Sequence, residues 1–160
     1  MTLNLATGSA RAALSVRKDD PGWPFVGLVR NSYAAICADP PWRFRTWSET
    51  NQKKSASRYY DLMTTENIQA LPVADLAADD CVLFLWATNP MLPQALRVMK
   101  SWGFSYKTCG FDWMKAHNGQ IDMFREDADA LMGMGFWTRS NSEPCLLATR
   151  GHPKRLSAGV

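Results

Sequence analysis

The hydrophobic pattern of the chain contains two apolar runs that predict buried strands. One covers residues 33–38 (YAAICA) and the other residues 81–87 (CVLFLWA), and neither run alternates with polar positions. Unbroken apolar runs of this length are typical of strands covered on both faces, as in a parallel α/β sheet. Two prolines follow the first run and cannot continue a hydrogen-bonded ladder, so this strand is expected to end beside Asp39.

A helical period follows the second apolar run. Apolar side chains recur three or four positions apart over residues 90–101 and just beyond, at Leu92, Ala95, Leu96, Met99 and Trp102. Gly103 stands where a C-terminal cap belongs. A strand is predicted over residues 106–114, so that this region forms a β-α-β unit with a right-handed crossover.

The other segments predict a short helix, an arm and loops. Thr64 can cap a helix that carries Glu66 in its first turn and is closed by Pro72. Residues 1–24 are rich in small and charged side chains and predict a mobile N-terminal arm, which leaves residues 25–160 as one domain. Two long loops are predicted over residues 43–58 and 116–134, and a hairpin is predicted between residues 136–139 and 144–150 around residues 140–143.

Length, charge and cysteine usage restrict the class of protein. A chain of 160 residues with 46% apolar side chains can hold one compact domain with a core. Its net charge of +3 tolerates a phosphate-bearing partner without requiring one. The four cysteines are scattered and signal neither a zinc site nor a disulfide framework. No run approaches the roughly 20 apolar residues of a membrane span, and these features together favour a cytoplasmic protein.

The stretch Asp39-Pro40-Pro41-Trp42 is the strongest candidate for chemistry. Ligands of open α/β sheets bind at the carboxyl ends of the strands, so an acid held there by two prolines is a candidate functional residue. The alternative is a plain strand terminator, because Asp and Pro are common turn residues. All four residues together should occur by chance in on the order of one chain per several thousand of this length, which favours a function.

These four residue types suit the activation of an exocyclic amine on an aromatic base. The Asp39 carboxylate and the Pro40 carbonyl can accept both amine hydrogens, which localises the lone pair towards an incoming methyl group. Pro41 restricts Pro40 to extended geometry and so aims that carbonyl. Trp42 can stack on a base that has been flipped out of its strand. A sulfonium methyl group brings its own reactivity, so this chemistry requires neither a covalent nucleophile nor a metal.

The stretch resembles motif IV of amino-methyltransferases. With Trp42 it is similar to the family of the seventy-kilodalton subunit of the mRNA adenosine methyltransferase, which includes bacterial and phage adenine methyltransferases. The resemblance covers about residues 34–151 and includes the runs 84–86 (FLW), 113–115 (WMK), 133–139 (GMGFWTR) and 146–151 (LLATRG). It implies transfer of a methyl group from S-adenosylmethionine to N6 of adenine in nucleic acid. The implied fold is a Rossmann-like sheet in permuted order, with helices on both faces.

The resemblance also implies roles for single residues. Tyr60 would line the adenine site or pack at the start of the following helix, and Lys115 would stand at the rim of the site or be a plain surface lysine. Arg139 and Glu143 would position the substrate strand or pair with each other. The remaining implied contacts are Asn141 with the substrate, and Ala38 and Asp39 with the methionine end of the cofactor.

The loop over residues 43–58 is basic, and Lys53 and Lys54 are its central pair. Loops of this composition are commonly just solvated, but this one directly follows the Asp-Pro-Pro-Trp stretch. We therefore expect Lys53 and Lys54 to contact the phosphates of a nucleic acid, and we favour DNA over RNA as the polymer.

The chain departs from the family pattern at its C-terminal end. Members of the permuted class carry a following segment with a Lys-Pro-Asp-like stretch and a Glu-Leu-Phe-Ala/Gly-Arg strand, and the sequence stops at Val160 before either. The expectation is a truncated domain that holds the motif IV half, with an exposed apolar sheet edge that favours a homodimer or heterodimer. An alternative is a non-catalytic nucleic-acid-binding relative or a partner subunit of a methyltransferase.

Overall fold

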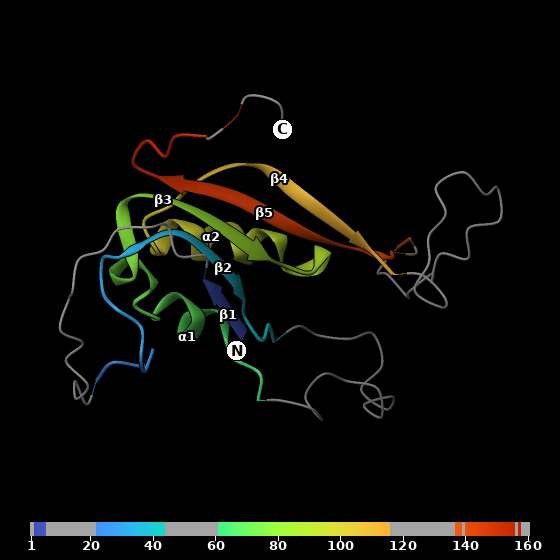
Figure 1. Cartoon of the computed structure of the whole chain (residues 1–160). Helices are drawn as coiled ribbons and strands as arrows, with labels where there is room; N and C mark the ends of the chain where they lie inside the picture. The colour runs from blue at the N-terminus through green and yellow to red at the C-terminus, as the bar shows by residue number, and fades with distance from the viewer. Residues whose placement is uncertain are drawn as a thin grey trace.

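A computed structural model describes residues 2–5, 22–43, 61–115, 137–138, 140–155 and 157. Five strands form one sheet in the order β1-β2-β3-β5-β4 (Figure 1). The strands are β1 (Thr2–Leu5), β2 (Tyr33–Asp39), β3 (Ala77–Trp86), β4 (Ser105–Met114) and β5 (Ser142–Arg150). This confirms the α/β class and both apolar strands, and Asp39 is the last residue of β2.

The sheet is mixed rather than wholly parallel. Strands β2 and β3 are parallel, with Cys37 opposite Phe84, and β5 runs antiparallel to both β3 and β4. The predicted β-α-β unit is present, since β4 has the same direction as β3, but β5 lies between them. The apolar pattern could not reveal this insertion, because it predicts strands and not their neighbours.

The helices begin and end where the capping residues predict. Thr64 caps α1 (Thr65–Gln69), and its Oγ1 accepts a hydrogen bond from the backbone amide of Asn67 at 3.2 Å. Helix α2 (Leu92–Ser101) has Trp102 as its C-cap, and Gly103 follows. The φ of +79° at Gly103 suits a residue without Cβ. The amides of Gly103 and Phe104 donate to the carbonyls of Lys100 and Met99, which is a Schellman cap. Two 3₁₀ turns, η3 (Val73–Asp75) and η4 (Asn89–Met91), complete the elements.

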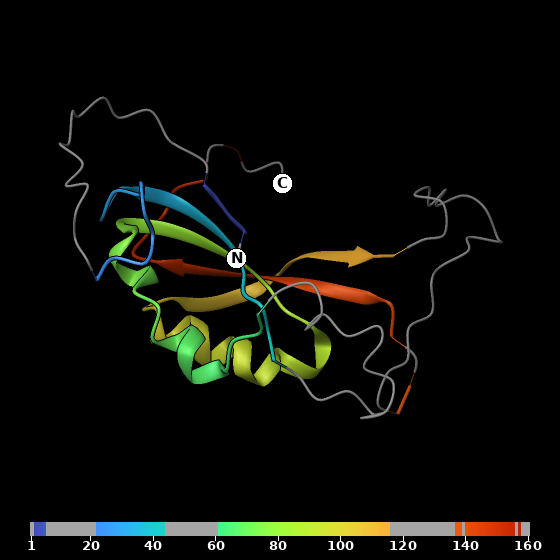
Figure 2. The ribbon, with the colours of Figure 1, turned by 90° about the horizontal axis from the view of Figure 1, so that it is seen from below.

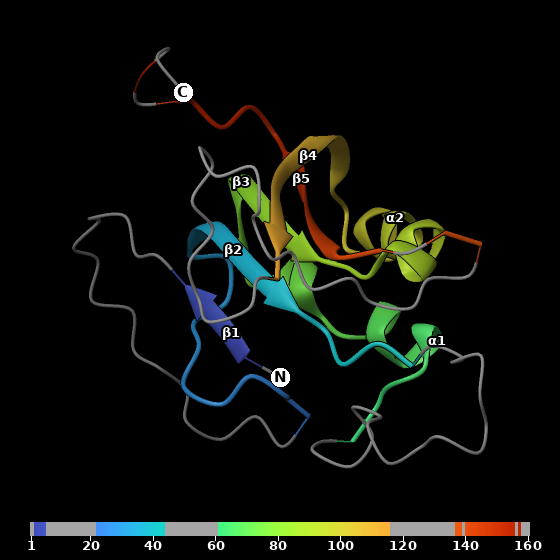
Figure 3. The same cartoon turned by 90° about the vertical axis from the view of Figure 1, so that its right-hand side faces the viewer.

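The core lies between the sheet and its two α-helices. Figures 2 and 3 show α1 and α2 side by side on one face of the sheet, and the indole of Trp102 in the core joins them by donating to the Ile68 carbonyl at 3.0 Å. In β3 the side chains of Leu83 and Leu85 are buried, whereas Phe84 between them is only partly covered. The described helices therefore cover one face, and the expected cover on both faces is not found in this part of the chain. None of the described helices is long and apolar enough to cross a membrane.

Strand β1 pairs antiparallel with the edge of β2 that faces away from β3, and Trp23 packs edge-on against the core residue Phe25. The division into an arm over residues 1–24 and a domain over residues 25–160 stays a prediction. The predicted hairpin between residues 136–139 and 144–150 is wrong, because β5 is hydrogen-bonded to β3 along one edge and to β4 along the other. Neither edge of β5 is left for residues 136–139, of which 136 and 139 lie outside the described residues.

Candidate active site

The Asp-Pro-Pro-Trp stretch forms a tight turn at the carboxyl end of β2. The backbone amide of Trp42 donates to the Pro40 carbonyl at 2.8 Å, and the amide of Met63 donates to the Pro41 carbonyl at 2.9 Å. Trp42 and Met63 form an isolated parallel bridge. These bonds anchor the turn to the residues just before α1 and leave Asp39 at its start, exposed to solvent.

Trp42 is a core residue. Only 5% of it is exposed, and its indole Nε1 donates a hydrogen bond of 2.9 Å to the carbonyl of Trp86 at the end of β3. The expected stacking of Trp42 on a base finds no support in this arrangement and stays a prediction. The ring instead ties the turn after β2 to the neighbouring strand, because an indole N–H buried in a core requires an acceptor.

The Pro40 carbonyl is partly engaged in the turn. Pro40 is buried, and its oxygen already accepts from Trp42. A carbonyl oxygen has two lone pairs, so one remains for an amine hydrogen. The methyl group of Ala38 is fully buried in the core. The expected contact of Ala38 with a cofactor stays a prediction.

The Asp39 carboxyl has an unusual environment for an exposed acid. Desolvation at the end of the sheet raises its pKa above the ordinary value, and the negative charge of Glu143 raises it further. The pKa of Asp39 therefore lies closer to neutral pH than that of a free aspartate. A perturbed acid at the carboxyl end of a strand marks a candidate functional site.

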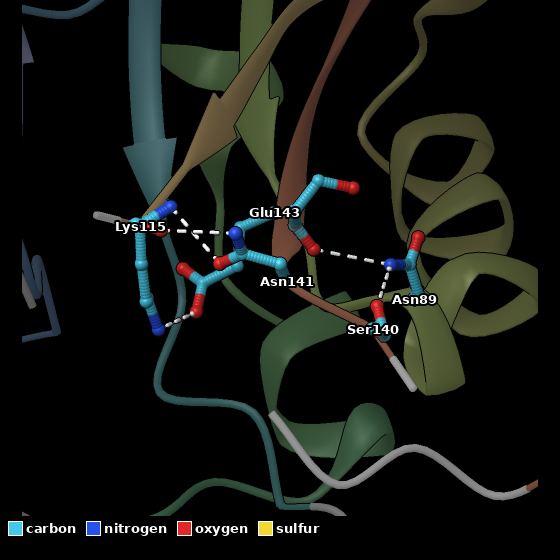
Figure 4. Close-up of polar contacts among 6 residues, drawn as sticks. Asn89, Lys115, Ser140, Asn141 and Glu143 are labelled. Carbon is cyan, nitrogen blue, oxygen red and sulfur yellow. Dashed lines mark hydrogen bonds and ion pairs between the residues drawn. The ribbon is translucent and has the colours of Figure 1, made fainter. Parts of the chain in front are cut away.

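Glu143 reaches this end of the sheet from β5. It pairs in register with Trp113 of β4, so both side chains lie on the same face. Its carboxylate accepts from Lys115 Nζ at 2.5 Å (Figure 4). The same Nζ lies 5.4 Å from the centroid of the Trp113 ring. The structure thus gives Glu143 a lysine partner, while Arg139, the other suggested partner, lies outside the described residues.

Asn141 binds the backbone of Lys115 with both ends of its amide. Its Oδ1 accepts from the Lys115 amide at 3.1 Å, and its Nδ2 donates to the Lys115 carbonyl at 2.9 Å. This reciprocal pair reproduces one step of an antiparallel ladder beyond the end of β4. The amide is therefore occupied within the protein, and the expected substrate contact of Asn141 has no support from this arrangement.

Asn89 is a residue of this region that the sequence patterns did not single out. It opens η4 directly after β3, and its Nδ2 donates to Ser140 Oγ at 2.9 Å and to the Ser142 carbonyl at 3.1 Å (Figure 4). An asparagine placed two residues after a buried strand was a weak signal that could have drawn attention to it. The other expected site residues, Tyr60, Lys53 and Lys54, lie outside the described residues.

Asp39 thus stands at the carboxyl end of a parallel strand pair, where the ligands of open α/β sheets bind. The MT-A70 family model matches residues 33–160, and the chain belongs to this family. This confirms the family resemblance seen in residues 34–151.

Three curated relatives are similar to the chain. The Type II methyltransferase M.MunI of Mycoplasma sp is 36% identical over 110 residues, which are 59% of this chain and 47% of that protein. The N(6)-adenosine-methyltransferase MT-A70-like protein of Drosophila melanogaster is 26% identical over 132 residues, 82% of this chain and 19% of that protein. The N(6)-adenine-specific methyltransferase METTL4 of Homo sapiens is 29% identical over 104 residues, with 62% of this chain and 20% of that protein covered. The chain thus spans about half the length, or less, of these relatives.

Proposed function

We propose that this chain is an S-adenosylmethionine-dependent adenine-N6 methyltransferase that acts on nucleic acid. The observation that carries the proposal is the placement of Asp39 at the carboxyl end of β2, at the start of a turn anchored by Trp42. Family membership and relatives whose names specify N(6)-adenine and N(6)-adenosine methylation support it. We place DNA before RNA, because the adenosine-methyltransferase relative is the more distant one, at 26% identity against 36% for the Type II methyltransferase.

In this proposal Asp39 is the catalytic residue. Its carboxylate accepts one hydrogen of the adenine amine, and the free lone pair of the Pro40 carbonyl accepts the other. Both acceptors draw the nitrogen lone pair out of conjugation, and their effect grows as positive charge develops on the nitrogen in the transition state. Pro41 and the bond from the Trp42 indole to β3 hold these acceptors in place, so that little reorganisation is needed during the reaction.

The residues at this end of the sheet fit a cationic cofactor. Asp39 and Glu143 are two carboxylates close enough for one to raise the pKa of the other, and a positive group between or beside them relieves this repulsion. Asp39 would lie near the sulfonium and amino end of S-adenosylmethionine. When bound, this cofactor supplies a methyl group that is already activated by the positive sulfur.

The substrate strand would be held by basic and aromatic side chains around Asp39. We propose phosphate contacts for Lys53 and Lys54 and base or strand contacts for Tyr60 and Arg139, on the strength of their place in the sequence. Lys115 and Glu143 are proposed to border the adenine, because their ion pair lies on the same face as Trp113, which is 54% exposed.

A non-catalytic nucleic-acid-binding relative, or a partner subunit of a methyltransferase, is the second candidate. It is favoured by one observation: Pro40 is buried with its carbonyl already engaged by Trp42. If that carbonyl cannot reach an amine, Asp39 alone would not hold both hydrogens. Such a protein would bind nucleic acid without turnover.

Transfer of a labelled methyl group from S-adenosylmethionine to adenine-containing DNA and RNA oligonucleotides distinguishes the two candidates. The proposed enzyme methylates at least one polymer at N6, and Asp39→Ala abolishes the transfer while oligonucleotide binding persists. Binding of oligonucleotides by both proteins with transfer by neither would overturn the enzyme proposal and support the binding relative.

A further inference from the structure

We propose that Asn89 is a positioning residue: through Ser140 and Ser142 it holds the start of β5, and with it the Glu143 carboxylate, at the end of the sheet where Asp39 lies. The inference rests on the proposed function for its catalytic meaning. Its structural content stands on the hydrogen bonds of Asn89 and on the strand register, which pairs Ala38 with Leu85 and Trp86 with Cys145 and so brings the ends of β2 and β5 to one end of the sheet. Asn89 itself would touch neither the base nor the cofactor.

The ladder between β3 and β5 ends before it reaches Glu143. The last strand pair is Trp86 with Cys145, followed by one more bond from the Ala87 amide to the Pro144 carbonyl at 3.0 Å. Beyond this point the chain enters η4, and in the described part of the chain this segment makes no further backbone hydrogen bond to β5. Asn89 fills this gap, because its side-chain Nδ2 donates to the Ser142 carbonyl, the next acceptor but one along β5.

The opposite edge of the same segment is held in a similar way. Strand β4 ends at Met114, and the Asn141 amide continues its ladder with two hydrogen bonds to the Lys115 backbone. The two asparagines therefore extend two ladders with side-chain groups where backbone is lacking. Asn89 thus holds Ser140 and Ser142 from one side, Asn141 between them is held to Lys115 on the other, and Glu143 is the next residue (Figure 4).

Of these two contacts, the one made by Asn89 after β3 matters more for the position of Glu143 than the one made by Asn141. Strand β4 lies at the outer edge of the sheet, and all its residues except Gly110 are exposed, so it holds β5 less rigidly than an inner strand would. The Lys115–Glu143 ion pair is also about half exposed and contributes little to placement. Asn89 instead connects the start of β5 to the end of β3, which is the direct neighbour of β2 and Asp39.

Other titratable groups lie near Asp39 besides Glu143. Cys37 lies on its own strand and Cys145 comes from β5, and the negative charge of Asp39 contributes to the raised pKa of each thiol. Lys115 follows β4 as the partner of Glu143. The charge of the amino terminus lowers the pKa of Asp39 and opposes Glu143. Strand β3 contributes no charged group at this end, since Phe84, Leu85 and Trp86 do not titrate. Among the described residues, Glu143 is the side chain whose charge raises the pKa of Asp39, so a change at Asn89 should act on Asp39 through the position of Glu143.

The test is a titration of the Asp39 carboxyl, followed by nuclear magnetic resonance with ¹³C-labelled aspartate and assigned with Asp39→Asn. We expect Asn89→Ala to lower the pKa of Asp39 in the same direction as Glu143→Gln, and the double variant to show no more than the Glu143→Gln shift. Ser140→Ala removes only the Asn89–Ser140 bond and keeps the bond from Asn89 to Ser142, so it should lower the pKa of Asp39 by less. This variant replaces Asn89→Ala in the test if Asn89→Ala does not fold. Asn67→Ala on the exposed surface of α1 is the matched control and should leave the titration unchanged.

Methyl transfer provides the second measurement. A displaced Glu143 should lower kcat by about ten- to a hundredfold with a smaller change in KM, because misplacement by about 1 Å costs up to this much. Asn89→Gln, which keeps the donor, should recover part of the loss. An unchanged Asp39 titration in both Asn89→Ala and Ser140→Ala would overturn the positioning role, even if the melting temperature falls. A shifted titration without transfer in the wild type would keep this inference and reject the proposed function.

Discussion

The negative charge of Glu143 at the start of β5 raises the pKa of Asp39 at the end of β2, although β3 lies between the two strands. Desolvation is the larger cause of the raised pKa of Asp39, and this charge is the second. Two carboxylates from non-adjacent strands are thereby brought to one end of the sheet. The neighbouring charge of Glu143 therefore affects the pH at which the proposed catalytic acid, Asp39, loses its proton.

Replacement of Asp39 by Asn tests its role without changing its size. The amide places an N–H donor where an acceptor is needed, so methyl transfer should fall by about 10²–10³-fold. Stability should change by no more than about 0.5 kcal/mol, because an exposed end-of-strand side chain supports no core. Asp112→Asn on exposed β4 is the control and should retain transfer. Full activity of Asp39→Asn would reject Asp39 as the catalytic residue.

The raised pKa of Asp39 predicts how transfer depends on pH. Protonation of Asp39 removes the negative charge that stabilises the developing positive nitrogen and turns one carboxyl oxygen into a donor. Activity should therefore be lost as pH falls through the pKa of Asp39, at a higher pH than for an ordinary aspartate. Glu143→Gln removes the neighbouring negative charge and should move this acid limb to lower pH. The measurement is kcat/KM against pH for both proteins, and an upward displacement in the variant would contradict the electrostatic assignment.

Trp42→Phe separates a core role from a stacking role. Phe keeps an aromatic face but cannot donate to the Trp86 carbonyl, so urea unfolding should show a loss of about 1–3 kcal/mol. Trp42→Ala should cost more, about 3–5 kcal/mol, because a large buried ring is deleted. A Trp42→Phe protein with unchanged stability and a raised KM for oligonucleotides would instead support direct contact of Trp42 with a base.

Gly151 is required at the end of β5 for steric reasons. Its φ is +64°, and a Cβ at this position would overlap the Asp79 carbonyl and the Asp80 carboxylate. Gly151→Ala should therefore cost more than the roughly 1 kcal/mol expected for a left-handed backbone alone. Gly27→Ala is the matched control, because its φ is +82° but no atom lies within 4 Å of the added methyl group. Equal melting temperatures for the two variants would contradict the steric argument.

Neutralising the basic pair after the Asp-Pro-Pro-Trp stretch tests phosphate binding. The double variant Lys53→Gln, Lys54→Gln should bind oligonucleotides more weakly, and the slope of log affinity against log salt should fall by up to about two. Lys100→Gln, an exposed lysine in the last turn of α2, is the control. An unchanged slope would remove residues 53–54 from the binding surface.

Local chemistry in the sequence determined the elements and the place of Asp39. The apolar runs specify β2 and β3, Thr64 and Gly103 specify helix ends, and two prolines end β2 at the acid. These features were predictable because each depends on residues close together in the chain. The family resemblance rests on the same kind of local motif.

Tertiary structure decided how those elements contact one another. Three features join residues at least 28 positions apart. They are the insertion of β5 between β3 and β4, the hydrogen bond from the buried Trp42 indole to the Trp86 carbonyl, and the ion pair of Glu143 with Lys115. Hydrophobic periodicity does not indicate such partners, because it predicts only which side chains are buried. For the same reason, Asn89 acquires its place in the site only when β3 and β5 lie side by side.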